Sequence, residues 1–191
     1  MALFSESKIR ARADRSTTTR TTDSVLNEKF QVTSQVTQFD IFLSHSFSDK
    51  KLILGIWLSL EDLGYKVYVD WINDRELSRS SVTKETARVL RARMLSCKSL
   101  FYATTTSSSS SKWMPWELGF KDGHNRKAAI LPVTGGYGEA YAGQEYLGIY
   151  PYVTEGATQG QPNINRLWIH TSASCYVLFD SWLTGTDPYE R

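Results

Sequence analysis

The chain has 191 residues, of which 41% are hydrophobic, and this is enough for one domain with a buried core. Its 22 Lys and Arg residues against 20 Asp and Glu residues give a net charge of +2 without a basic stripe, which argues against a nucleic-acid-binding protein. Two cysteines without a Cys-x-x-Cys pair exclude a disulfide scaffold, and no apolar run is long enough to span a bilayer. We expect a cytoplasmic protein with no membrane contact.

Residues 1–38 differ in composition from the rest of the chain. They are rich in Ser and Thr, and their six Lys and Arg residues outnumber four Asp and Glu residues. We expect a short helix near residues 5–14 and then flexible chain. This basic N-terminal arm either docks on a phosphate-bearing partner or, as we favour, is a solvated tail. The main domain would then occupy residues 39–191, including a C-terminal extension.

From Phe39 onward, strand and helix patterns alternate. Short apolar, β-branched and aromatic runs predict strands, and apolar residues at helical spacing predict helices. The predicted strands are 39–43, 65–71, 99–103, 128–133 and 146–150, the predicted helices are 52–63, 82–94 and 113–123, and a final apolar element at 174–183 is expected to be a helix. This alternation predicts an α/β fold with a mainly parallel five-stranded sheet and helices on both faces.

Polar loops follow the first three predicted strands, at residues 44–46, 70–75 and 104–113. In open parallel sheets ligands bind at the carboxyl ends of the strands, so these loops are expected to gather on one rim. His45 lies on that rim and is a candidate for a substrate contact. The other two histidines, His124 and His170, are expected at the surface, and the three have no metal-ligand spacing.

The segment 111–120 places two tryptophans and a carboxylate close together. Pro115 is typical of the first turn of a helix, and from such a start Trp113 and Glu117 lie one turn apart on a shared face. An acid beside aromatic rings suits the binding of a positively charged ring or sugar. The helix dipole alone also favours an acid near a helix N-terminus. These residues taken by themselves leave both interpretations open.

Known nucleotide-binding motifs do not explain the chain. It has no Gly-x-x-x-x-Gly-Lys-Ser/Thr phosphate loop, and the glycines at 135–138 do not complete the dinucleotide fingerprint because position 141 is Tyr. No Ser-His-Asp set can be assigned from the sequence either.

Taken in order, the motifs resemble those of Toll/interleukin-1 receptor (TIR) domains, most closely the stand-alone bacterial members. The resemblance covers roughly residues 39–153. Its parts are the first conserved box at 39–46, the second strand at 68–70, the BB loop at 72–81, the catalytic-glutamate spacing from Trp113 to Glu117, and a bacterial tail element at 146–152. The BB-loop region lacks the family's usual Gly or Pro, and His45 and Ser46 stand where many eukaryotic relatives have basic residues.

The resemblance implies a flavodoxin-like fold and cleavage of the nicotinamide–ribose bond of NAD+, with NAD+ as substrate and no separate cofactor or metal. The family's glutamate maps onto Glu117, its second-strand acid onto Asp70, and its first-box loop onto Ser44, His45 and Ser46. Trp113, or Trp71 from the BB region, is the candidate for stacking on the cationic nicotinamide. The product, whether ADP-ribose, a cyclic ADP-ribose or a conjugate, stays open.

The resemblance also implies partners. We expect a homo-oligomer formed through TIR–TIR contacts, and a bacterial antiphage defence role in which the product signals to a downstream nucleotide-sensing effector. The first alternative is a non-catalytic adaptor module that acts through homotypic TIR–TIR interaction. The second is a flavodoxin-like transferase that acts on nucleosides instead of NAD+.

Overall fold

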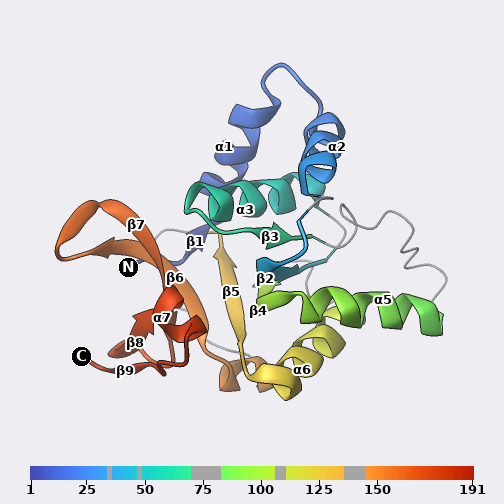
Figure 1. Ribbon diagram of the computed structural model, residues 1–191. Helices are drawn as coiled ribbons and strands as arrows, with labels where there is room; N and C mark the ends of the chain where they lie inside the picture. The colour runs from blue at the N-terminus through green and yellow to red at the C-terminus, as the bar shows by residue number, and fades with distance from the viewer. Residues whose placement is uncertain (34–35, 47–48, 70–82, 106–110, 136–144) are drawn as a thin grey trace.

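The computed structural model describes residues 1–33, 36–46, 49–69, 83–105, 111–135 and 145–191 (Figure 1). A central sheet is covered by helices on both faces. The helices α1 (Glu6–Thr17), α2 (Thr22–Thr33) and α3 (Lys50–Asp62) lie over one face, and α5 (Lys84–Leu95) and α6 (Trp113–Asn125) lie over the other (Figure 1). The α/β class and the flavodoxin-like arrangement predicted from the sequence are therefore confirmed. Within the described residues, no helix is both long and apolar enough to cross a membrane.

The sheet is larger than the five strands predicted. In the described part of the chain it has nine strands, and its central order is β3-β2-β4-β5-β6 with all neighbours parallel. These strands are β2 (Phe39–Ser44), β3 (Val67–Tyr68), β4 (Cys97–Thr104), β5 (Ala128–Thr134) and β6 (Tyr152–Thr158). The antiparallel strands β7 (Gln161–His170), β8 (Cys175–Leu178) and β9 (Tyr189–Glu190) extend the sheet, and β1 (Phe4–Ser5) pairs with β5.

Local sequence signals account for the helix that follows β2. Asp49 caps α3 by accepting a hydrogen bond of 2.9 Å from the Leu52 amide. The helix is followed by Gly64, whose φ of +93° lies in the left-handed region that favours glycine. The apolar residues between these two signals are buried against the sheet, so α3 is fixed on its face.

Two predictions for the C-terminal half are wrong. Residues 146–150 do not form a strand, because Glu145–Ile149 is a 3-10 helix, η2, that begins at a positive φ of 49° and leaves Ile149 78% exposed. The strand beside β5 is β6, with Tyr152 opposite Ile130. Residues 174–183 were expected to be one helix, but they form β8 and a five-residue helix, α7 (Phe179–Leu183).

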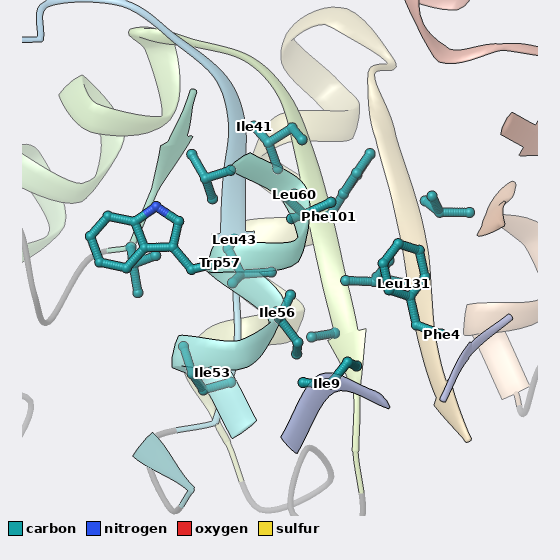
Figure 2. Close-up of a cluster of buried hydrophobic side chains, with 14 of the residues drawn as sticks. Phe4, Ile9, Ile41, Leu43, Ile53, Ile56, Trp57, Leu60, Phe101 and Leu131 are labelled. Carbon is teal, nitrogen blue, oxygen red and sulfur yellow. The ribbon is translucent and has the colours of Figure 1, made fainter. Parts of the chain in front are cut away.

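The N-terminal segment is part of the core and not a solvated tail, so that prediction is wrong. Phe4 and Ile9 are buried in the same apolar cluster as Leu131, Ile56 and Trp57 (Figure 2). Helix α1 was predicted over part of its length, but its contacts were not. Helices α1 and α2 contribute buried side chains to this cluster and pack on α3, and β1 joins the sheet beside β5. The division of the chain between residues 38 and 39 stays a prediction.

His170 was expected at the surface and is instead 4% exposed. It lies in β7 between two tyrosine rings of neighbouring strands, with Tyr152 at 5.1 Å and Tyr176 at 5.0 Å between ring centroids. Its Nε2 is 2.9 Å from the hydroxyl oxygen of Thr154. The antiparallel extension thus has a polar ring at its centre, held by stacking and by a hydrogen bond.

Candidate functional site

The centre of the candidate site is a contact between Ser44 and Glu117. Ser44 is the last residue of β2, and Glu117 lies on α6, which packs against β2, β4 and β5. The Ser44 hydroxyl donates a hydrogen bond of 2.6 Å to Glu117 Oε2, and the two residues are 1% and 0% exposed. The contact brings the segment 44–46 together with the helix that follows the third of the predicted rim loops.

Helix α6 begins where the sequence predicted. Trp113 is its first residue, Pro115 lies in its first turn, and Arg126 ends it in a left-handed conformation. Glu117 is the fifth residue of the helix, beyond the first turn in which the helix dipole stabilises an acid. The dipole alone therefore does not explain the presence of this acid.

A fully buried carboxylate is costly, and a charge-assisted hydrogen bond offsets part of that cost. The Ser44 bond also fixes the direction in which Oε2 points. A carboxylate so held can stabilise positive charge that develops next to it, which is the chemistry expected of the family's glutamate.

The other residues of the first box are also buried. His45 is 0% exposed, and its Nδ1 donates to the Leu43 carbonyl oxygen over 2.9 Å, which assigns the proton to Nδ1 because a carbonyl only accepts. Ser46 is 7% exposed. Both residues are therefore buried in the segment directly after β2. Their contact with a substrate stays a prediction.

Trp113 is half-buried and belongs to an aromatic row along α6. Its ring meets Trp116 edge to face at 5.3 Å, Trp116 stacks on Phe120 at 6.0 Å, and Arg91 of α5 lies over Trp116 at 5.5 Å. The contacts of these rings with one another and with Arg91 account for the several aromatic residues of the helix. Stacking of Trp113 on nicotinamide stays a prediction.

Several predicted site residues lie outside the described part of the chain. These are Asp70, Trp71, the BB-loop segment 72–81 and the hydroxyl-rich residues 106–110. Their roles stay predictions as well.

Sequence reasoning missed Lys121, which is buried one turn after Glu117 on the same face of α6. Its Nζ donates to the main-chain carbonyls of Met94, over 3.0 Å, and of Cys97. Burial lowers the pKa of Lys121 below its ordinary value, and burial raises the pKa of the Cys97 thiol to about 12. The spacing of four residues from Glu117 places Lys121 on the same helix face, but no signal in the sequence marks it as buried.

The fold and this contact define a flavodoxin-like α/β protein with a buried carboxylate at the carboxyl edge of its parallel sheet. Comparison with protein-family models gives no match. The chain is 56% identical over 146 residues to the "Probable 3' cyclic ADP-D-ribose synthase ThsB'" of Bacillus cereus (strain MSX-D12), and the match covers 76% of this chain and 75% of that protein. The chain belongs to the family of that protein, the bacterial TIR proteins.

A second relative is more distant. The "Putative cyclic ADP-D-ribose synthase TIR2" of Cytobacillus dafuensis is 32% identical over 83 residues, which cover 43% of this chain and 22% of that protein. The family assignment made from the sequence motifs is therefore confirmed.

Proposed function

We propose that this protein cleaves the nicotinamide–ribose bond of NAD+ and releases a cyclic ADP-ribose. The observation that carries the proposal is the buried Glu117 carboxylate, held by Ser44 at the carboxyl end of β2. The names of the two relatives, both of which are called cyclic ADP-D-ribose synthases, support this choice over other reactions of a carboxylate.

The chemistry needs little from the protein beyond one positioned acid. Nicotinamide is cationic in NAD+ and leaves as a neutral molecule, taking the electron pair of the bond, so no acid is needed to protonate it. The ribose is left with oxocarbenium character, as in glycoside hydrolysis. Glu117 stabilises this positive charge as it develops and can bind the ribose hydroxyls. A positioned group of this kind contributes about 10²–10⁴-fold in rate, or roughly 3–5 kcal/mol.

The group that captures the sugar cation decides the product. Water would give ADP-ribose, whereas a hydroxyl of the second ribose or the adenine would close a ring. We propose ring closure, in which the attacking group forms the new bond to the ribose carbon and an attacking hydroxyl gives up its proton. Glu117 is then placed to accept that proton as a general base.

Access to Glu117 supports a role for self-association. The side chain is 0% exposed in the single chain, so a substrate reaches it only after neighbouring side chains move. We propose that TIR–TIR contacts between copies of the chain favour this rearrangement. In a defence role, the cyclic product would then signal to a separate protein with a nucleotide-sensing domain.

The test is nicotinamide release from NAD+ by concentrated protein, with Glu117→Gln as the matched variant and chromatography of the nucleotide products. We expect release that falls by about 10²–10⁴-fold in the variant, and a cyclic product. ADP-ribose as the sole product would overturn ring closure but not cleavage. Self-association without nicotinamide release at any concentration would favour the adaptor alternative.

A further inference from the structure

A fully buried lysine shares a face of α6 with Glu117. Lys121 follows Glu117 by four residues, so the two side chains leave the helix one turn apart in the same direction. Both are 0% exposed, and together with Met114 and Leu118 they form the buried face of α6. Lysine is almost never fully buried unless its ammonium group is paired, so this position needs a specific explanation.

The partners of Lys121 lie at the turn between α5 and β4. Its Nζ donates to the Met94 carbonyl in the last turn of α5 and to the Cys97 carbonyl at the start of β4. The last carbonyls of a helix lack partners within the helix and carry partial negative charge, so they suit an ammonium group. One turn further along α6, Asn125 Nδ2 donates to the Lys98 carbonyl over 3.0 Å. Two side chains in the second half of α6 thus donate hydrogen bonds to main-chain carbonyls of the same turn.

We propose that Lys121 is a positioning residue, which sets the rotation and height of α6 at which Glu117 meets Ser44. The inference rests on the proposed NAD+ cleavage. Ser44 holds the Glu117 carboxylate from the end of β2, while Lys121, one turn later on the same face of α6, holds the helix from the turn between α5 and β4. A displacement of about 1 Å at a reacting group can cost about 10²-fold in rate, so a fixed helix matters for catalysis.

An apolar residue at position 121 would fill the same space without the cost of burying an ammonium group. Apolar contacts are not directional, however, and leave a helix free to make small rotations and shifts. Hydrogen bonds from one amine to two carbonyls restrict both the rotation and the shift of the helix. The ammonium group therefore contributes orientation, and its removal should affect catalysis more than stability.

The experiment compares Lys121→Met with Lys98→Met, a control that removes an exposed lysine, with its surface ion pair to Asp40, from the same end of β4. For each variant, kcat and KM for nicotinamide release, the melting temperature, and hydrogen–deuterium exchange of peptides over Trp113–Asn125 are measured. We expect Lys121→Met to lower kcat by about 10²-fold with KM unchanged. Exchange over α6 should become faster, and the melting temperature should fall only by the amount that follows from leaving the Met94 and Cys97 carbonyls without this donor. Lys98→Met should behave as the wild type in all four measurements.

A Lys121→Met protein with wild-type kcat and wild-type exchange over α6 would overturn the inference. So would a loss of kcat that is matched by a proportional loss of thermal stability. If Lys121→Met does not fold, Lys121→Arg keeps the charge and the donors but lengthens the group. In that variant, a kcat that follows the exchange of α6, whether both stay at the wild-type value or both change, supports positioning, and a change in one without the other overturns it. If the wild type releases no nicotinamide, the proposed function fails, and the exchange data alone decide whether Lys121 fastens α6.

Discussion

The Ser44 hydroxyl donates a 2.6 Å hydrogen bond to Glu117 Oε2 and so joins β2 to α6 across 73 positions of sequence. Sequence motifs had assigned Ser44 to substrate binding and Glu117 to catalysis as separate functions. The contact gives Ser44 a second role, because a serine that orients the carboxylate acts on the reaction even without touching NAD+.

Replacement of Ser44 by Ala should lower kcat for nicotinamide release and leave KM nearly unchanged. A hydrogen bond to a charged group contributes about 1.5–3 kcal/mol, which corresponds to a loss of roughly 10- to 100-fold in rate. Ser59→Ala is a matched control, since Ser59 donates to the Gly55 carbonyl within α3, away from Glu117. A Ser44→Ala enzyme with raised KM and wild-type kcat would instead identify Ser44 as a contact to the substrate in its ground state.

Replacement of Gly55 by Ala tests whether the N-terminal helix belongs to the core. A Cβ added at Gly55 would lie under 3.0 Å from the Ile9 carbonyl oxygen of α1, so α1 must shift. Overpacking of this kind costs about 1–3 kcal/mol, and each kcal/mol lowers the melting temperature of a chain of this size by roughly 2–4 °C.

The control for Gly55→Ala is Gly123→Ala in α6, where a Cβ meets nothing within 4 Å. There the higher helix propensity of Ala should stabilise the protein by up to about 1 kcal/mol. Thermal unfolding of both variants is the measurement. If residues 1–38 were a solvated tail, both substitutions would raise the melting temperature.

The elements that were predicted well are those whose apolar pattern reports burial directly. The strand at Phe39–Ser44 is buried on both sides and reads as a continuous apolar run, as expected for a central parallel strand. Helix α6 was located from Pro115, and its acid was recognised from its spacing to Trp113. The packing of helix α1 was not predicted, because only Ile9 and Ala13 of its twelve residues are buried and most of its sequence is typical of a solvent-exposed segment.

Other features depend on tertiary contacts that composition does not reveal. Residues 146–150 have strand-like composition, but Tyr146 and Ile149 are exposed in η2, so their β propensity is not matched by burial. Lys121 is the converse case, since a lysine is assigned to the surface unless its carbonyl partners are known. Those partners, Met94 and Cys97, lie 27 and 24 residues away, and no local pattern connects them to the lysine.

Stability should fall in mild acid because of His170. Burial lowers the pKa of His170, while its hydrogen bond to the Ser172 carbonyl opposes that shift only in part. The unfolded chain therefore binds the proton first as the pH falls. The stability contributed by neutral His170 is fully present above the unfolded pKa of about 6.5, and it is lost as the pH falls from there to the lower folded value.

The test is the melting temperature measured from pH 8 down to pH 5, roughly one to two units on either side of the unfolded pKa of histidine. The melting temperature should fall less steeply over this range in His170→Phe than in the wild type. Phe keeps an aromatic ring between Tyr152 and Tyr176 but cannot bind a proton. His124→Phe is the control, because His124 is exposed on α6 and stacks on Phe120. Equal slopes in the wild type and His170→Phe would show that other groups cause the acid sensitivity.

Nicotinamide release per mole of protein should rise with protein concentration. Glu117 is fully buried in the single chain, so the dilute monomer is expected to hold the carboxylate away from NAD+. Self-association supplies contact energy that can favour an open arrangement, and a two-state equilibrium shifts only as far as that differential energy allows. The test measures initial rates over a dilution series and the self-association of the same samples by sedimentation, with Glu117→Gln as the background. A constant specific activity from monomer to assembly would mean that the site opens without a partner, and the burial of Glu117 would then reflect a barrier within each chain.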